Sequence, residues 1–500
     1  MYRRPSPGQL SFVDFYLPFG GHLSGENRWV KLAELIPWSE FEGLYAEQLS
    51  ASQGAPAKSF RVALGALIIK EKLGLSDEET VQQVRENPYL QYFLGFHEYR
   101  DAAPFDASML THFRQRLSGE LLSQVNQHVV SAALVSEVNA SSEDEDEPGG
   151  DDAGASEARA RAEDGEDVPH QGCLLLDASV APADIRYPTD LDLLHQARAS
   201  SERILDRLYQ TMVTPPAKKP RTYRQQARQA YLSVAKQRRP SAQLRRKAVG
   251  QQLRYLRRNL NHIDGLLATG ACLSDLKPYW YRRLLVIHEV FRQQWQMYQQ
   301  RQRRIDHRLV SLSQPHVRPI VRGKAGRPVE FGAKIALSCV SGYALLERLD
   351  WEAFNESTDL IEHVERYRER FGCYPVSVHV DQIYRTRANR AWCKAHGIRL
   401  SGPPLGRPKA AEKTATTAQV KQDAAIRNGV EGKFGQAKRR FGLARVMAKL
   451  ASTAATSIAV TVLVMNLEQR LRAFIFFCCR LVLCLWREHI LGANKLSFTG

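Results

Sequence analysis

The sequence predicts an α/β protein with a central mixed sheet, a helical region before the sheet and a basic helical insertion within it. Short apolar runs bounded by small polar residues, such as GCLLLDAS and PVSVHVDQIY, are typical of strands buried on both faces. Apolar residues at 3,4 spacing indicate helices between residues 60 and 130 and again after residue 250. The 500 residues, 44% of them hydrophobic, are enough for several domains with large cores.

The amino-terminal part is predicted to be a compact helical domain over residues 1–134. Ser76 followed by three acidic residues is a typical helix start. The stretch PFDASMLTHFRQRL begins another helix behind Asp106 or Ser108. Its arginines either face the phosphates of a nucleic acid or form a solvated basic surface.

Residues 135–171 are predicted to be an acidic disordered linker. Thirteen acidic residues and two arginines lie between Glu137 and Asp167, so this stretch carries −11 and the remaining chain carries +28. With no Val, Leu or Ile between Val138 and Val168, the segment cannot bury enough apolar surface to fold. The linker is either an inert solubilising tether or a competitor with DNA for the basic surface.

The sheet is expected to begin with GCLLLDAS, which ends at Asp177 and is followed by a helix from Thr189 to about Met212. Alternation through Val329 to Leu337 and a turn at Ser341–Gly342 predict a hairpin. Further elements follow in the same way: a helix over 351–371, a strand ending at Asp381, a helix over 387–396, a short strand IRLSG and a helix over about 419–440.

A basic helical-hairpin insertion is predicted at about 215–315. Fourteen Lys or Arg residues and no acid lie between Lys218 and Arg258. Apolar stripes run from Leu253 to Leu267 and from Leu284 to Tyr298, on either side of the break ATGACLSDLKP. Three roles stay open from the residues: an arm along a nucleic-acid backbone, a dimerisation element, or a helical insertion without a further role.

Composition indicates which kind of partner the chain binds and in which compartment it acts. A net charge of +17 and a pI near 9.5 favour a polyanionic partner. Residues 450–467 carry no charge but hold six polar side chains, and Arg480 interrupts the next apolar run, so both fall short of the ~20 apolar residues of a membrane span. We expect a buried helix, no membrane partner and no secretory signal. Eight cysteines without a CxxC pair are typical of reduced cytoplasmic thiols.

Three carboxylates are candidates for a metal site. Asp177 and Asp381 end predicted strands, where an ionised acid needs a cation, a hydrogen-bond network or solvent. At ~100° per residue, Arg427, Glu431 and Lys438 share one face of a helix with Phe434, which places that face against protein or a ligand. Taken singly, each Asp also fits an ordinary strand-end residue, and Arg427 with Glu431 fits an ordinary i,i+4 pair.

Three such acids in a basic protein suit two-metal phosphoryl transfer. Hard Mg²⁺ ions prefer oxygen ligands. Two of them about 4 Å apart activate the attacking oxygen and stabilise the leaving oxygen of an in-line displacement. The sequence has no GxxxxGK[ST] loop, so ATP hydrolysis is not indicated.

The blocks LLLDAS, VHVDQIYRTRANR and RNGVEGKFGQAKRRFGL resemble the three motifs of bacterial insertion-sequence DDE transposases. The likeness covers most of the chain, and RPVEFGAKIALS resembles the family's strand block between the first two acids. Residues 60–120 resemble the helical domain of the branch numbered four and five in the insertion-sequence nomenclature. The resemblance implies an RNase H-like DDE catalytic domain over 172–470 and leaves a carboxy-terminal helical tail over 471–500.

By that resemblance Asp177, Asp381 and Glu431 are the catalytic triad and hold two Mg²⁺ or Mn²⁺ ions. Arg427 and Lys438 match the R-x3-E-x6-K part of the family signature and would grip DNA phosphates. Tyr384 and Asn389 fit the second block and would orient Asp381 or contact DNA. The signature's Tyr is replaced by Ala424, so its phosphate contact is unfilled or moved to another residue.

The implied function is transposition of a bacterial insertion sequence. Such an enzyme binds terminal inverted repeats, cuts double-stranded DNA with metal-activated water and joins the freed 3′ end to a target. The resemblance also implies a homodimer or higher multimer, acting in the cytoplasm at the nucleoid. Two alternatives stay open: a non-catalytic DNA-binding protein derived from such an element, and a metal-dependent nuclease without strand transfer.

Overall fold

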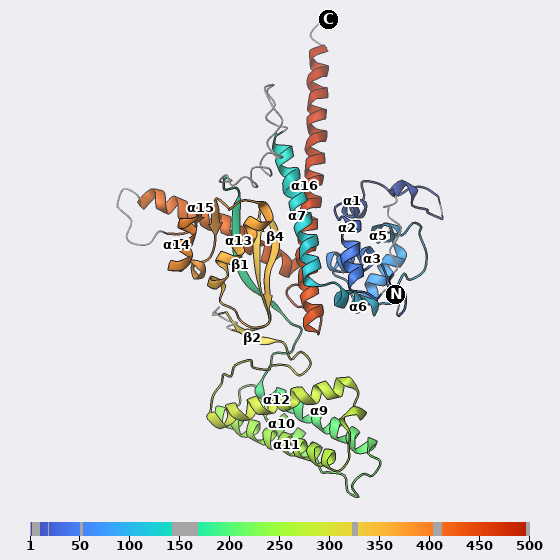
Figure 1. Ribbon diagram of the computed structural model, residues 1–500, viewed down its shortest axis with the longest axis vertical. Coiled ribbons are helices and arrows are strands. Elements are labelled where there is room, and N and C mark those ends of the chain that lie inside the picture. Colours follow the sequence, from blue (N-terminus) through green and yellow to red (C-terminus); the bar gives the residue numbers. More distant parts are fainter. Residues whose placement is uncertain are drawn as a thin grey trace.

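The computed structural model describes residues 2, 11–18, 20–50, 54–142, 169–322, 329–403 and 413–496. Figure 1 shows three bodies: a sheet with its covering helices, a group of amino-terminal helices, and a helical body below the sheet. Two long helices, α7 (Gly119–Ser142) and α16 (Ala451–Leu496), run side by side between the first two bodies. The chain is therefore of the α/β class, as its sequence predicts.

The sheet is mixed and is organised around β1 (Cys173–Pro182). On one side β1 pairs antiparallel with β3 (Val329–Val340), and on the other it pairs parallel with β5 (Ser377–His379). β3 also pairs antiparallel with β2 (Arg318–Val321) and β4 (Tyr343–Asp350), while β5 pairs parallel with β6 (Arg399–Leu400). The apolar run at the start of β1 is buried, as expected for a strand covered on both faces.

The position of Asp177 differs from the expectation that it ends its strand. β1 continues to Pro182, and Asp177 is paired opposite Leu337 in the middle of the ladder with β3. The small residues after Asp177 suggest a turn by composition, but β3 is long enough to hold all of them in register. Asp381, in contrast, follows the end of β5 as expected, and its carboxylate caps the short helix η5 (Gln382–Tyr384).

The hairpin of β3 and β4 is confirmed, with its turn at the expected residues. Ser341 and Gly342 both have positive φ angles, 46° and 80°, which a tight two-residue hairpin turn requires. The elements after it are η4 (Glu356–Thr358), α13 (Leu360–Phe371), α14 (Arg387–Ala395) and α15 (Lys413–Arg440). The predicted helix over 351–371 is thus a short turn followed by a helix.

The amino-terminal body is helical, as predicted. Its elements are η1 (Phe12–Asp14), α1 (Arg28–Glu34), α2 (Trp38–Glu47), α3 (Phe60–Leu73), α4 (Asp77–Glu86), α5 (Pro88–Phe93) and α6 (Met109–Arg116). Ser76 caps α4 by accepting a hydrogen bond from the backbone N–H of Glu79. These helices share one hydrophobic core with α16 and with residues of β1 and β3, so this body is packed onto the sheet domain.

The apolar helix near the carboxyl end is buried, as expected. Residues 451–474 of α16 are long and apolar enough to cross a membrane, and 78% of the most apolar stretch is buried inside the protein. Thr456 and Thr461 point their hydroxyls at backbone carbonyls and at Glu71 rather than leaving them unpaired. The polar residues in this stretch therefore serve contacts between helices.

The inserted body holds four main helices: α9 (Asp190–Thr211), α10 (Arg224–Ala235), α11 (Ala242–Ala268) and α12 (Pro278–Gln300), with a short η3 (Leu273–Asp275). Its hydrophobic core is separate from that of the sheet domain. The two apolar stripes that predict a hairpin are buried on α11 and α12, but they pack with α9, so the insertion is larger than a hairpin. Thr189 caps α9 at the expected residue.

The predicted linker over 135–171 lies mostly outside the described residues. The described part of the chain follows α7 to Ser142 and resumes at residue 169, so α7 continues into the range predicted as linker. Residues 143–168 are not described, and the acidic linker there stays a prediction.

Asn466 of α16 joins three elements at the centre of the molecule. It is fully buried, and its amide donates to Asn126 of α7 at 2.8 Å and to the carbonyl of Ala344 in β4 at 2.6 Å. Its carbonyl accepts from the backbone N–H of Ala344 at 2.8 Å. All the polar groups of this side chain are therefore paired away from water.

We expect Asn466→Leu to destabilise the chain by about 3 kcal/mol, because each buried partner left unpaired costs ~1–3 kcal/mol. Thermal unfolding followed by circular dichroism measures the loss as a lower midpoint. Ser452→Ala, at an exposed position of the same helix, is the matched control and should leave the midpoint unchanged. Equal midpoints for Asn466→Leu and the unchanged chain would contradict this role.

Candidate functional site

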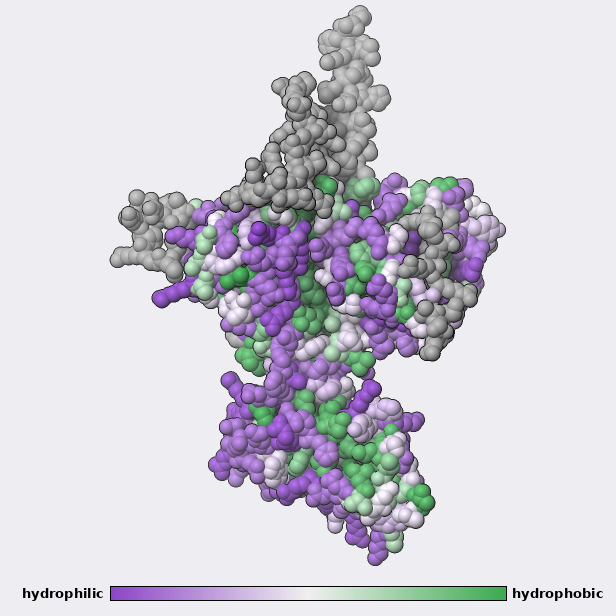
Figure 2. Space-filling view, viewed as in Figure 1, coloured by the Kyte–Doolittle hydropathy of each residue, from purple (hydrophilic) through white to green (hydrophobic). Residues whose placement is uncertain are grey.

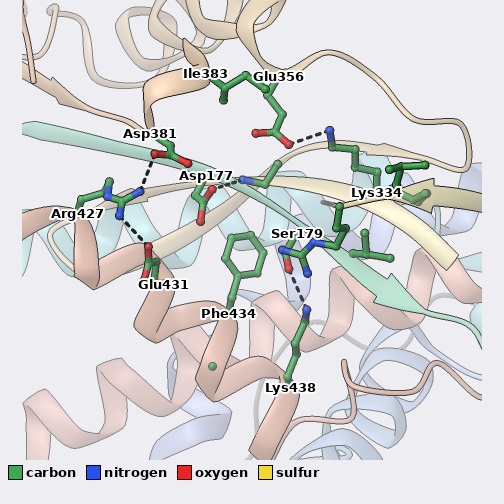
Figure 3. A pocket seen from close by; sticks show the side chains of 16 residues that line it. Asp177, Ser179, Lys334, Glu356, Asp381, Ile383, Arg427, Glu431, Phe434 and Lys438 are labelled. Atoms are coloured by element: carbon green, nitrogen blue, oxygen red, sulfur yellow. Dashed lines mark hydrogen bonds and ion pairs between the residues drawn. The ribbon is translucent and has the colours of Figure 1, made fainter. Parts of the chain in front are cut away.

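The three predicted acids line one cavity of about 680 Å³. Asp177 comes from the middle of β1, Asp381 from the end of β5, and Glu431 from α15, which crosses this side of the sheet. Figure 3 shows the three carboxylates turned toward the same space. The parallel pairing of β1 with β5 brings the two aspartates together although 204 positions separate them in the chain.

Arg427 lies between two of the acids. Its guanidinium contacts Asp381 (Nη1 to Oδ1, 3.2 Å) and Glu431 (Nη2 to Oε1, 3.0 Å), as Figure 3 shows. The side chain of Arg427 is 25% exposed, while Asp381 and Glu431 are about half exposed. Arg427 and Glu431 thus form more than an i,i+4 pair on the surface of α15, because Arg427 also reaches across the cavity to Asp381.

Asp177 is the most buried of the three acids. Burial raises the pKa of its carboxyl to about 6, partly offset by a hydrogen bond from the backbone N–H of Ala178 at 2.8 Å. The negative charges of Glu356, Glu431 and Asp381 raise the pKa further. Among the described residues no cation forms an ion pair with Asp177, whereas Asp381, Glu431 and Glu356 each have a cationic partner.

The helix face that carries Glu431 turns toward the protein, as Phe434 predicts. Phe434 is 6% exposed and lines the cavity beside the acids. One turn further along α15, Lys438 donates from Nζ to Ser179 Oγ of β1 at 2.8 Å. The face of α15 therefore presents one carboxylate and two cations to the cavity.

The cavity contains a fourth acid that the sequence motifs do not indicate. Glu356 of η4 lines it and pairs with Lys334 of β3 at 2.8 Å. Glu356 follows the hairpin at no spacing that relates it to the other acids, so the sequence carries no signal for it. Glu356 reaches the cavity because η4 packs against η5, which follows Asp381.

Tyr384 and Asn389 lie behind the cavity. Their side chains are 1% and 4% exposed, respectively, so neither is available to DNA in this arrangement. The amide of Asn389 donates to the carbonyl of Tyr384 at 2.7 Å and to that of Ser357 at 2.8 Å. These bonds tie η5, which follows Asp381, to η4, and burial favours the orienting role over the DNA contact.

The donor set fits a hard divalent cation by its chemistry. Carboxylate oxygens are the ligands that Mg²⁺ and Mn²⁺ prefer, and four carboxylates line this one cavity. Within the described ranges, however, no three acidic, His or Cys side chains are already gathered as closely as one ion requires. The guanidinium of Arg427 occupies the space between two of them, so binding would require these side chains to shift.

Comparison with known proteins finds two families that match separate parts of the chain. Residues 378–468, which include Asp381 and Glu431, match the family described as "Transposase DDE domain". Residues 18–116 match the family described as "Transposase domain (DUF772)". Two separate regions of the chain are therefore similar to transposase domains, and one of these is a DDE domain. The resemblance to insertion-sequence DDE transposases, which the three motifs predict, is confirmed.

One curated relative has a sequence that is 38% identical over 105 residues, which is 21% of this chain and 50% of that protein. It is the uncharacterized protein ORF8 in the nfe locus of Rhizobium meliloti. The chain therefore spans about half the length of the curated relative it matches. No solved structure matches the chain.

The raised pKa of Asp177 predicts a pH-dependent stability. A carboxyl with a folded-state pKa near 6, above its ordinary 3.8, stabilises the fold below about pH 4, and this contribution is lost as the pH rises through 6. Without divalent cations, Asp177→Asn should therefore be more stable than the unchanged chain at pH 8, by about 2 kcal/mol. At pH 4 the difference should nearly vanish.

Thermal unfolding in EDTA at the two pH values measures this difference. Asp264→Asn, at an exposed position of α11, is the control and should show no such pH dependence. An Asp177→Asn chain that is less stable than the unchanged chain at pH 8 would show that the ionised carboxylate is well accommodated.

Proposed function

We propose that the chain is a DDE transposase of a bacterial insertion sequence, which binds terminal inverted repeats, cleaves DNA and joins the freed 3′ end to a target. The observation that carries the proposal is the convergence of Asp177, Asp381 and Glu431 on one cavity of a basic protein. The two matched transposase domains support it from the comparisons.

The sheet supports an RNase H-like catalytic domain. β4, β3 and β1 are joined by antiparallel pairing, and β5 and β6 follow on the other side of β1 in parallel. The acids of such a domain come from the central strand, from the end of its parallel neighbour and from a later helix. Asp177, Asp381 and Glu431 occupy those places.

Asp177, Asp381 and Glu431 would hold two Mg²⁺ or Mn²⁺ ions, whose presence would activate the attacking oxygen and stabilise the leaving one. The chain's own residues prepare the site. Arg427 forms ion pairs with both Asp381 and Glu431, and Phe434 supplies an apolar part of the cavity wall. Arg427 and Lys438 would meet the phosphates of DNA, because both cations line the same cavity as the acids.

The inserted body would supply binding along the DNA backbone. Twelve of the fourteen cations between residues 218 and 258 are exposed, and among the described residues only Lys219 and Arg224 pair with an acid, Asp206. Figure 2 shows hydrophilic side chains over much of this body. Unpaired exposed cations are the groups that displace counterions from a phosphate backbone.

The proposed function also assigns a role to each part of the chain, an oligomeric state and a place in the cell. Residues 1–134 would be the DNA-binding domain and 172–470 the catalytic domain, with 471–500 as the tail. The linker, predicted over 135–171, would begin after α7 ends at Ser142, and the insertion, predicted at about 215–315, would also include α9. Handling two DNA ends together favours a homodimer or a higher multimer. Its substrate would place the protein in the cytoplasm, at the nucleoid.

We expect Asp381→Ala to lower cleavage of terminal-repeat DNA by about two orders of magnitude or more, because the site loses a carboxylate that faces the reacting phosphate. Purified chain, DNA with the inverted repeats that flank the gene, and Mg²⁺ measure this by gel. Glu369→Gln, on the exposed face of α13, is the control and should cleave normally. An Asp381→Ala chain that still cleaves would remove the triad assignment.

The same assay separates the proposal from its alternatives. A DNA-binding protein without catalysis would give no metal-dependent nick with the unchanged chain. A nuclease would nick the repeat ends but leave them unjoined when a target plasmid is added. Joined products define strand transfer.

DNA binding by the insertion is tested by its salt dependence. Arg238 and Arg239 are exposed and have no acidic partner among the described residues. Replacing both by Ala should lower the slope of log K against log salt by about 2, because each phosphate contact contributes ~0.9. The matched pair Lys219→Ala and Arg224→Ala should change the slope less, since Asp206 already neutralises part of their charge. Equal slopes for the unchanged chain and the Arg238/Arg239 variant would place the DNA elsewhere.

A further inference from the structure

We propose that Glu356 is a fourth acidic ligand of the catalytic site and shares one cation with Asp177. The inference rests on the proposed function and deepens it, because it assigns a residue outside the three motifs to the site. One cation, beside β1 and β3, would then be bound by both a strand residue, Asp177, and a loop residue, Glu356.

The first observation is the position of the Glu356 side chain. Glu356 belongs to η4, which follows β4, and it lines the same cavity as Asp177. Figure 3 shows its carboxylate directed down into the cavity, on the side where Asp177 and Lys334 lie. An acid of the loop surface would point to solvent, but the side chain of Glu356 is only 16% exposed.

The second observation is the distribution of cations. Arg427 contacts Asp381 and Glu431, and it leaves Asp177 without an ion pair among the described residues. On the Asp177 side, the ion pair of Lys334 is made to Glu356, and the same Nζ also donates to the carbonyl of Phe354 at 2.8 Å. Lys438 lines the same cavity, but its ammonium donates to Ser179. Asp177 and Glu356 therefore share the cavity with one ion pair in total for the two carboxylates among the described residues, an arrangement that a divalent cation would stabilise.

The third observation is that the loop carrying Glu356 is held in place. Asn389 fastens the carbonyl of Ser357 to the segment that follows Asp381. Behind it, Asp359 accepts from Arg348 of β4 at 2.9 Å. A side chain on such a supported loop has the fixed position that a metal ligand needs.

The rival explanation is that Glu356 only neutralises Lys334. The two explanations predict opposite effects for the two partners. If Glu356 is a ligand, Glu356→Gln weakens cation binding, whereas Lys334→Met removes a competing positive charge and strengthens it. If Glu356 is only the partner of Lys334, both changes lower the stability of the fold and neither weakens cation binding.

The experiment measures Mn²⁺ binding to the full chain without DNA, by electron paramagnetic resonance of the free ion. We expect Glu356→Gln to weaken binding about tenfold or more and Lys334→Met to leave it equal or tighter, with the thermal midpoint of each variant recorded alongside. Glu369→Gln, which removes the same charge from the exposed face of α13, should bind as the unchanged chain does. Unaltered Mn²⁺ affinity of a folded Glu356→Gln chain would overturn the inference.

Asp177→Asn distinguishes failure of this inference from failure of the proposed function. If Asp177→Asn loses Mn²⁺ and Glu356→Gln does not, the catalytic site stands and Glu356 is no ligand. If the unchanged chain binds no Mn²⁺, or Asp177→Asn binds it equally, the metal site itself is absent and both fall.

A second measurement needs no variant and covers the case of a Glu356→Gln chain that does not fold. Fe²⁺ with ascorbate and peroxide cuts a polypeptide close to a bound ion. We expect fragments of the unchanged chain that end near residue 356 as well as near 177 and 381, all suppressed by excess Mg²⁺. Cuts near 177 and 381 without one near 356 would overturn the inference.

Discussion

Repulsion among carboxylates in one partly buried cavity is the constraint on which the site depends. Four acids meet there, and each added negative charge raises the cost of ionising the others. Arg427 compensates Asp381 and Glu431, and Lys334 compensates Glu356. Asp177 has no ion pair among the described residues, and burial, followed by the charges of the neighbouring acids, raises its pKa to about 6. A divalent cation in this half of the cavity would remove the same cost, which links the electrostatics of the four acids to the chemistry proposed for the site.

The scaffold that holds these charges is the pairing of β1 with strands on both sides. The backbones of β1 and β3 approach so closely at Gly332 that a Cβ there would lie 2.0 Å from the carbonyl oxygen of Ala181. α15 then crosses the sheet and brings Glu431 to the aspartates. At its far end, Arg440 of α15 shares the buried Glu468 of α16 with Lys72 of α3. The helix that carries the third acid is thereby tied to the amino-terminal body.

The three bodies would have different tasks within the proposed function. The inserted body has its own core and a surface rich in unpaired cations, so it can bind a duplex without disturbing the sheet. The amino-terminal body shares its core with α16 and the sheet. Its contact with α15, the helix of Glu431, runs through the ion pairs that Glu468 makes with Lys72 and Arg440.

The sequence by itself determined the elements whose signals are local. Ser76 and Thr189 cap their helices, Ser341–Gly342 makes the hairpin turn, and the periodic apolar residues of the long helices face their cores. These features depend on neighbouring residues and on the period of the backbone, which a sequence displays directly. The sequence also predicts a shared site for the three motif acids, from the chemistry of phosphoryl transfer and the resemblance, and all three line one cavity.

Only the tertiary structure decided the features that depend on contacts between distant segments. Asp177 lies within its strand because β3 extends the ladder beyond it, and α9 joins the insertion because its apolar face meets α11. Glu356 reaches the cavity because η4 packs against η5. Arg427 bridges two acids that are 50 positions apart in the chain. Sequence spacing carries no information about such meetings, since charge and space in a cavity are set by all the segments that surround it at once.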